Sequence, residues 1–208
     1  VDAARDLARH CDVVTLEIEQ IATEVLEAAR EFAPTRPGAH VIGIVQDRVR
    51  QKAWLESGGY PLGPYRAVDG PRAIADAVGA FGECIAKSAR GGYDGRGQMR
   101  LRDASAAPDA WRAVGERPAV AERALSLAAE LSVMVARRPD GSVVVFPAAL
   151  NHHQRLALAW SVTPAPLPKR LLQRAADIAR GIAEQIELEG VLAIELFLTE
   201  SGDLFVNE

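Results

Sequence analysis

The chain has 208 residues, of which 49% are hydrophobic and 25% charged, and its net charge is −4. This composition is typical of a globular protein with one large or two small domains around a substantial core. It lacks the basic footprint of a nucleic-acid-binding protein, and no apolar run is long enough to cross a bilayer. Cys11 and Cys84 stand far apart without metal-ligand spacing, so we expect reduced core cysteines and a cytoplasmic protein.

Helical and strand patterns follow one another in irregular order. The stretch 1–10 is helical, and it leads to an apolar strand at Cys11–Glu17 and a helix at Ala22–Phe32 that Pro34 and Pro37 end. Apolar spacing predicts further helices at Gln46–Glu56, Pro71–Phe81, Ser105–Val114 and Arg170–Glu187. Strands are predicted at Tyr65–Val68, Cys84–Ala89, Gln98–Arg102, Ala119–Glu122, Glu130–Arg137, Ser142–Phe146, Leu156–Val162, Val191–Thr199 and Leu204–Glu208. The many hairpins predict a mixed α/β or α+β fold rather than a doubly wound Rossmann sheet.

The last hairpin places two acids in otherwise apolar strands. If Ser201-Gly202 forms a two-residue turn, Glu195 lies opposite Glu208. Like charges directly opposite each other destabilise a sheet, but a cation between them reverses this, and Mg²⁺ prefers carboxylate oxygens. Asn207 offers a further oxygen, although an ideal strand points it to the other face. Pairing of one acid with an arginine, or a slipped turn, is the alternative.

A glycine-rich loop, ARGGYDGRGQ at 89–98, follows a strand without opening a helix, so it is neither a P-loop nor a dinucleotide fingerprint. Its four glycines allow backbone N–H groups to approach an anion, and Arg90 and Arg96 add positive charge. This pattern favours a phosphate-covering lid, with a glycine-rich hairpin that binds nothing as the alternative.

Lys87 lies in the apolar strand before that loop, where an unpaired ammonium is costly and a nucleotide phosphate would supply a partner. A strand-edge lysine that reaches solvent is the alternative.

Glu122 ends a strand, as a nucleotide-binding hinge would, and Glu130 begins the next strand, where it could accept from ribose hydroxyls. Both are also compatible with ordinary surface glutamates. Asn151, His152 and His153 are predicted to lie in a loop, and without further ligands at metal spacing the histidines do not indicate zinc.

Six segments together resemble the 5-(carboxyamino)imidazole ribonucleotide synthases, an ATP-grasp family of purine biosynthesis. They are VVTLEIEQ (13–20), QDRVRQK (46–52), AKSARGGYDGRGQ (86–98), AERALSLAAELSVMVAR (121–137), FPAALNHH (146–153) and GVLAIELFLTESGDLFVNE (190–208). The resemblance covers nearly the whole chain, and GGYDGRGQ is its most specific part.

The resemblance implies an ATP-grasp fold and a set of site residues. Lys87 and Arg96 would act on the transferred phosphate, with Arg48 as a further phosphate contact. Glu195 and Glu208 would bind Mg²⁺ or Mn²⁺, and Asn207 would lie beside them. The remaining ATP contacts would be the loop residues Gly92, Tyr93, Asp94, Gly95, Gly97 and Gln98, the adenine hinge Glu122, Arg123, Ala124 and Leu125, the ribose acceptor Glu130, and His153.

The implied reaction is the ATP-dependent carboxylation of aminoimidazole ribonucleotide by bicarbonate, in a homodimeric cytoplasmic enzyme without a nucleic-acid or membrane partner. The alternatives are another ATP-grasp ligase, such as a formate-dependent purine transformylase, a module that binds ATP without turning it over, or a purely structural fragment.

The domain organisation that we expect is the end of an amino-terminal α/β, substrate-side domain at 1–45, followed by an ATP-grasp domain at 46–208. Within the latter we expect a lid at about 60–119 and a hinge at about 120–125. Because Val1 is no initiating Met and Glu208 falls within a predicted strand, we expect a longer enzyme with segments on both sides.

Overall fold

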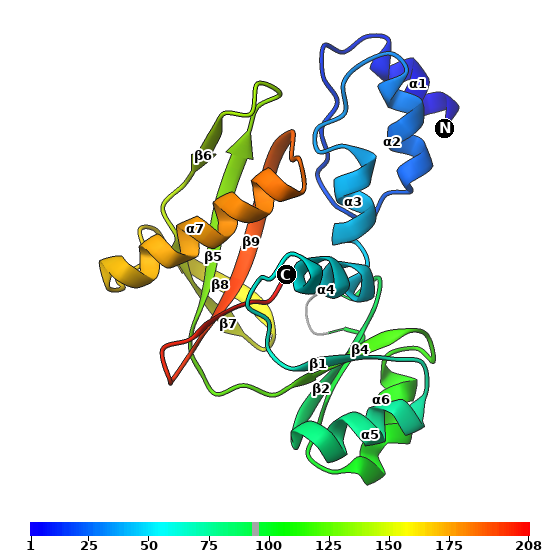
Figure 1. Cartoon of the computed structure of the whole chain (residues 1–208). Coiled ribbons are helices and arrows are strands. Elements are labelled where there is room, and N and C mark those ends of the chain that lie inside the picture. Colours follow the sequence, from blue (N-terminus) through cyan, green and yellow to red (C-terminus); the bar gives the residue numbers. More distant parts are fainter. Residues whose placement is uncertain (93–95) are drawn as a thin grey trace.

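The computed structural model describes residues 1–92 and 96–208, which form an amino-terminal group of helices and two separate sheets (Figure 1). The helices are α1 (Asp2–Ala8), α2 (Thr23–Arg30), α3 (Ala39–Val45), α4 (Arg48–Ser57), α5 (Pro71–Phe81), α6 (Ala107–Ala113) and α7 (Lys169–Gln185), with a 3₁₀ turn, η1 (Ala104–Ala106). The strands are β1 (Tyr65–Val68), β2 (Cys84–Ser88), β3 (Gln98–Leu101), β4 (Ala119–Arg123), β5 (Leu127–Arg137), β6 (Val143–Val145), β7 (Ala149–Gln154), β8 (Ala157–Val162), β9 (Gly190–Thr199) and β10 (Leu204–Val206). Among the described residues, no helix has both the length and the apolar character needed to span a membrane.

The amino-terminal segment is helical, and the strand predicted at Cys11–Glu17 is wrong. Here the backbone makes only an isolated parallel bridge between Val14 and Thr35, because the N–H of Val14 donates to Pro34 O and Val14 O accepts from Arg36 N. A single bridge does not extend into a ladder without a neighbouring strand. The apolar run AHVIGIV forms α3, which the sequence prediction missed.

The smaller sheet has the antiparallel order β1-β4-β2-β3, and α5 and α6 cover one of its faces. The alternation of β2 explains this arrangement, because Cys84, Ala86 and Ser88 are buried while Ile85 and Lys87 lie on the other face. The helices pack Ile74 and Ala110 against the buried side. The opposite face, which carries Ile85 and Lys87, is therefore not covered by these helices.

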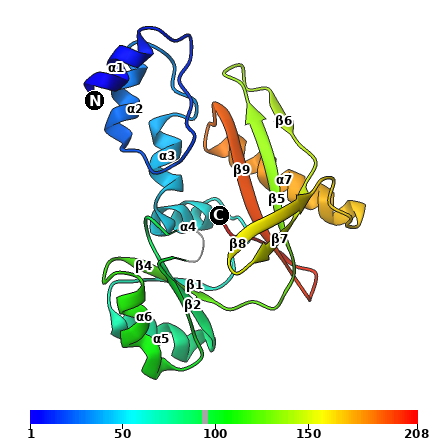
Figure 2. The ribbon, with the colours of Figure 1, turned by 180° about the vertical axis from the view of Figure 1, so that it is seen from behind.

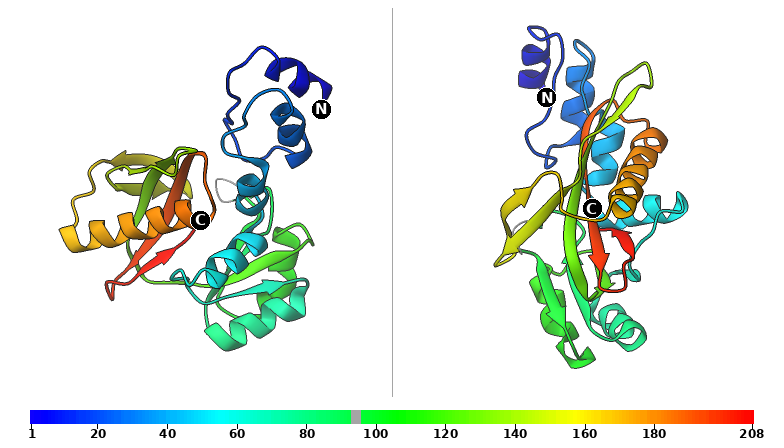
Figure 3. Two further views of the ribbon diagram at one scale, coloured as in Figure 1. Left: turned by 45° about the horizontal axis from the view of Figure 1, so that its top comes forward. Right: turned by 90° about the vertical axis from the view of Figure 1, so that its left-hand side faces the viewer.

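The larger sheet has the order β10-β9-β5-β7-β8, with β6 paired to β5, and α7 covers one face (Figures 2 and 3). Leu131 and Val133 of β5 and Leu196 of β9 pack under Ala179 and Ile182 of α7. The other face carries the alternate residues of the same strands. The hairpin predicted around residues 139–141 is confirmed by the antiparallel β5–β6 pair, whereas the predicted loop at 151–153 is wrong, since these residues belong to β7.

Helix α4 lies between the two sheets (Figure 1). Asp47 caps its amino terminus by accepting hydrogen bonds from the N–H groups of Val49 and Arg50. Arg48 N donates to Ala89 O at 2.9 Å, which fixes the first turn of α4 to the chain that follows β2. Gln51, Lys52 and Leu55 are the buried residues of the helix.

The register predicted for the last hairpin is wrong by one residue. Leu204 pairs with Leu198 and Val206 with Leu196, and Thr199 N donates to Asp203 O, so the loop has three residues rather than two. Gly202 adopts φ +86°, the left-handed conformation that such a loop requires. Beyond β10, Asn207 and Glu208 both come opposite Glu195, because Asn207 N donates to Glu195 O at 2.8 Å and Glu195 N donates to Glu208 O at 2.8 Å. This bulge keeps the predicted Glu195–Glu208 pair although the register of β10 is shifted.

Candidate active site

A cleft between the two sheets gathers most of the predicted site residues. It contains a cavity of about 540 Å³ with a narrower extension of about 120 Å³. Residues from both sheets line the two parts in common, namely Ile85, Lys87, Arg100, Leu127 and Phe197. We therefore treat them as one cleft with a wide and a narrow end.

Lys87 points from β2 into this cleft. Its Nζ donates to Glu122 Oε2 at 2.7 Å and to Asn207 Oδ1 at 3.3 Å, and it lies 5.7 Å from the centre of the Phe197 ring. The side chain is only 13% exposed, so the alternative of a lysine that reaches into solvent does not apply. The ammonium is instead held in place at the junction of both sheets.

Lys52 forms a second cationic contact that the sequence analysis did not assign. Its Nζ lies 3.3 Å from Glu122 Oε1 and donates to Asn207 O at 3.0 Å. Burial lowers the pKa of Lys52, and Glu122 counters this. Burial alone would raise the pKa of Glu122, but Lys87 and Lys52 outweigh it and the pKa is lowered. Lys52 follows Arg48 by one helical turn, and this spacing on α4 was the available signal.

The acidic side of the cleft consists of Glu195 and Glu208. Burial, followed by the charge of Glu208, raises the pKa of Glu195. Asn207 Nδ2 donates to Glu195 Oε2 at 3.2 Å, and Arg48 Nη2 donates to Glu208 Oε2 at 3.0 Å. Both acids line the wide end despite the shifted register, because Asn207 and Glu208 form a bulge opposite Glu195 and both line the cleft.

Glu130 and His153 lie next to each other on the face of the larger sheet that α7 leaves uncovered. Glu130 of β5 pairs with Asn151 of β7, and His153 Nδ1 lies 3.1 Å from Glu130 Oε2. Both line the wide end of the cleft. Neither is an isolated surface residue.

The glycine-rich segment borders the wide end through Gly92, Arg96, Gly97 and Gln98. Gly97 has φ +68°, and a Cβ there would lie 2.6 Å from Ser88 Oγ, so a larger residue would not fit. Arg90 instead donates to Asp47 Oδ2 at 2.9 Å and is not part of the lining. Three further predicted contacts, Tyr93, Asp94 and Gly95, lie outside the described residues.

The predicted hinge, residues 122–125, lines the narrow end. Its backbone is partly engaged within the protein, since Arg123 N donates to Pro64 O and Ala124 N to Glu83 O. The Glu122 carboxylate is paired with Lys52 and Lys87. Side chains of the hinge therefore shape this end, while part of its backbone is already hydrogen-bonded.

The donor set fits a hard divalent cation that is shared with a phosphate. Among residues 1–92 and 96–208 no group of three or more His, Cys, Asp or Glu side chains forms a closed metal cage. Mg²⁺ characteristically uses one or two carboxylates and takes its other ligands from water and substrate phosphates. Glu195 and Glu208 match that pattern, because both line the cleft wall, and burial followed by the charge of Glu208 raises the pKa of Glu195.

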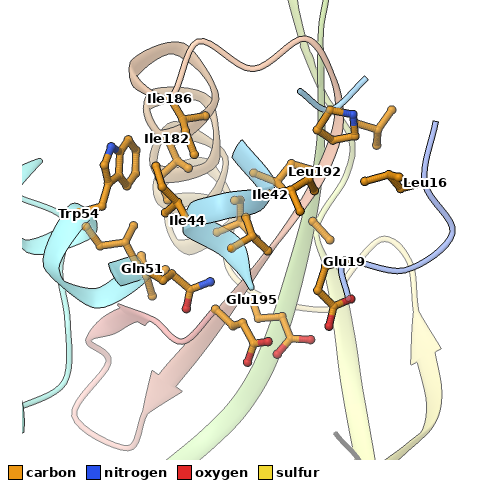
Figure 4. A pocket seen from close by; sticks show the side chains of 18 of the residues that line it. Leu16, Glu19, Ile42, Ile44, Gln51, Trp54, Ile182, Ile186, Leu192 and Glu195 are labelled. Atoms are coloured by element: carbon orange, nitrogen blue, oxygen red, sulfur yellow. The ribbon is translucent and has the colours of Figure 1, made fainter. Parts of the chain in front are cut away.

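A second cavity of about 380 Å³ adjoins the acidic side, and Figure 4 shows it at close range. Glu195 and Glu19 point into its lower part, and apolar side chains of α3, α7 and β9 surround the rest, including Ile42, Ile182 and Leu192. Glu19, Glu195 and Glu208 line this cavity and the cleft alike. The acids thus stand between two spaces of different polarity.

Residues 53–208 match the model of the ATP-grasp domain. The chain therefore belongs to the ATP-grasp family, and the predicted fold is confirmed. A structure of biotin carboxylase from Campylobacter jejuni superposes with a TM-score of 0.88 at 19% identity, over 100% of this chain and 50% of that one. That likeness concerns the fold alone.

Several proteins that are similar to this chain are N5-carboxyaminoimidazole ribonucleotide synthases. The N5-carboxyaminoimidazole ribonucleotide synthase of Bacillus subtilis (strain 168) is 35% identical over 208 residues, which are 100% of this chain and 55% of the relative. The enzyme of the same name from Brucella melitensis is 34% identical over 99% of this chain and 58% of its own length. A crystal structure of the ADP complex of an N5-carboxyaminoimidazole ribonucleotide synthetase has a TM-score of 0.92 at 32% identity, and covers 100% of this chain and 55% of that one. These findings confirm the predicted resemblance, and the chain spans about half the length of these relatives.

Proposed function

We propose that the cleft binds ATP with Mg²⁺ and that the whole protein carboxylates aminoimidazole ribonucleotide with bicarbonate, giving N5-carboxyaminoimidazole ribonucleotide. The observation that carries this proposal is the position of Lys87 in the wall of a cleft that Glu195 and Glu208 also line, in a chain of the ATP-grasp family. A relative solved with ADP, and another solved with ADP and aminoimidazole ribonucleotide, support it.

The cations of the cleft would hold the polyphosphate. Lys87, Arg48 and Arg96 line the wide end, and we assign all three to phosphate oxygens, with Lys87 and Arg96 nearest the transferred group. Lys87 is bonded to Glu122 and Asn207, and these contacts fix the position of its ammonium. Such preorganised charge stabilises the transition state of phosphoryl transfer without reorganisation at the moment of reaction.

Glu195 and Glu208 would hold Mg²⁺, with Mn²⁺ as a substitute, and Asn207 would orient the Glu195 carboxylate through its amide. When bound, the metal neutralises phosphate charge. The raised pKa of Glu195 supports this role, because a nearby dication relieves the repulsion between the two acids.

The narrow end would take the adenine base, with Glu122, Arg123, Ala124 and Leu125 forming the hinge. Glu130 and His153 would contact the ribose, since they line the wide end beside it. Gly92, Gly97 and Gln98, together with Tyr93, Asp94 and Gly95, would cover the phosphates.

The reaction would proceed in two steps. A bicarbonate oxygen attacks the γ-phosphorus of ATP, the bond to ADP breaks, and carboxyphosphate forms. The exocyclic amine of the ribonucleotide then attacks the carboxyl carbon, inorganic phosphate leaves, and the amine loses a proton. We place the acceptor on the side of the 380 Å³ cavity, because that space meets the cleft at Glu195 and Glu208. A homodimeric state and a cytoplasmic location are further expectations from the family resemblance.

Measuring ADP release by the whole protein tests the proposal. ADP should form only when aminoimidazole ribonucleotide and bicarbonate are both present, and formate should not replace bicarbonate. Use of formate with a different purine precursor would point to a transformylase. Mg²⁺-dependent ATP binding without ADP formation under any acceptor would point to a non-catalytic module, and either result would contradict the proposal.

A further inference from the structure

Arg100 lies where the wide and narrow ends of the cleft meet, and it lines both. On the adjoining strand Ile85 is its direct partner, and it too lines both ends. Directly opposed residues of an antiparallel pair point to the same face of the sheet, as do Lys87 and Gln98, the next pair on this face. Arg100 thus stands on the cleft wall between the lysine and the hinge.

Glu83 holds this guanidinium in a defined orientation. Arg100 Nε donates to Glu83 Oε1 at 2.8 Å and Arg100 Nη2 to Glu83 Oε2 at 3.1 Å, which is the two-pronged contact that fixes the plane of an arginine. Glu83 O also accepts from Ala124 N at 2.8 Å. One residue therefore fixes both the hinge backbone and the arginine beside it.

Arg102 provides an internal comparison. Its Nε donates to the same Glu83 Oε1 at 3.0 Å, yet it lines neither end of the cleft. The two arginines together lower the pKa of Glu83 to about 2, with Arg100 contributing most. Glu83 therefore stays ionised at neutral pH. Arg100 makes two bonds to it and lines the cleft, whereas Arg102 makes one bond and lines neither end.

We propose that Arg100 is a positioning residue for the purine base. The plane of its guanidinium would stack on the face of the base that points away from the hinge. The inference rests on the proposed ATP binding in this cleft. Arginine stacks on π systems through its planar, weakly hydrated head. The Arg100 side chain is 58% exposed, so a face remains open to a ligand although its edge is bonded to Glu83. Because Arg100 lies toward the hinge rather than the phosphates, it acts on binding of the nucleotide and not on the chemical step.

The test compares Arg100→Met with Arg102→Met, a neighbouring control that loses one bond to the same Glu83 carboxylate. Calorimetry measures the Kd for ATP in the presence of Mg²⁺, and steady-state kinetics at saturating ATP measure kcat. We expect Arg100→Met to raise the Kd for ATP roughly 5- to 20-fold, as loss of a cation–π contact predicts, with kcat kept within about twofold. Arg102→Met should change neither quantity by more than roughly twofold, as for an exposed ion pair.

Arg100→Lys separates stacking from simple charge. It keeps the positive charge but not the plane, so it should bind ATP about as weakly as Arg100→Met. Full affinity in Arg100→Lys, equal effects of Arg100→Met and Arg102→Met, or a loss of kcat in Arg100→Met without a change in Kd would each overturn this inference alone. Absence of ATP binding to the unaltered protein would overturn the proposed function as well.

Discussion

The two walls of the cleft differ in how their buried charges are balanced. The smaller sheet presents Lys87 with its own counter-ion, Glu122, so its positive charge is compensated inside the protein. The larger sheet presents Glu195, whose pKa is raised by burial and by the charge of Glu208. The charge of the first wall is thus balanced within the protein, and we propose that a bound cation balances the charge of the second. Under the proposed function, this difference would give polyphosphate recognition to the preorganised positive groups and metal dependence to the acids.

We expect the largest effect from a substitution of Glu122, because its carboxylate is the counter-ion of two buried lysines. Glu122→Gln leaves both ammonium groups without their counter-ion, so we expect a loss of about 3–5 kcal/mol in the free energy of unfolding, as for a broken buried ion pair. Urea unfolding measures it. Glu200→Gln, an exposed acid in the loop after β9, is the control. A loss in Glu122→Gln no larger than in this control would contradict the counter-ion role.

Lys87→Ala removes the cation from the first wall. We expect kcat of the whole protein to fall at least roughly a hundredfold, by comparison with the loss of other preorganised charge-stabilising groups. Lys169→Ala serves as the control, because Lys169 is exposed at the start of α7. Turnover within a few-fold of the unaltered protein would remove Lys87 from its assigned position beside the phosphates.

Glu208→Ala alters the second wall. Here too we expect at least a roughly hundredfold fall in turnover, but with a higher Mg²⁺ concentration needed for half-maximal rate, which Lys87→Ala should not show. Steady-state rates over a Mg²⁺ series measure both effects. An unchanged Mg²⁺ requirement would mean that Glu208 acts through its bond to Arg48 instead.

The smallest effect concerns pH and Glu195. Its carboxyl has a raised pKa in the folded protein, so its stabilising contribution is present below the unfolded pKa and is lost as pH rises through the folded value. Without Mg²⁺, Glu195→Gln should therefore be more stable than the unaltered protein at neutral pH, with the difference vanishing in acid. Thermal unfolding between pH 4 and pH 8 checks this. The same pH slope in both proteins would show that Glu195 is not strained by its surroundings.

Sequence patterns predicted the elements that carry strong local signals. Proline at the first turn and glycine after the last residue give α5 its boundaries, and the alternation of β2 places Lys87 on the cleft face. Tertiary context decided the rest. The isolated bridge at Val14 depends on Thr35, far along the chain, and the hairpin register depends on whether Ser201-Gly202 or a three-residue loop forms the turn. Lys52 was missed because its importance comes from Glu122 and Asn207, which are distant in sequence.

The central claim is that an ammonium on one wall and a metal on the other bind the same polyphosphate. Calorimetric titration of ATP into the unaltered protein and into the Glu195→Gln/Glu208→Gln double variant, each with Mg²⁺ and with a chelator, tests it most directly. We expect Mg²⁺ to strengthen ATP binding by at least about tenfold in the unaltered protein, or roughly 1.4 kcal/mol, and to have little effect in the double variant. Equal strengthening by Mg²⁺ in both proteins, or no binding in either, would contradict it.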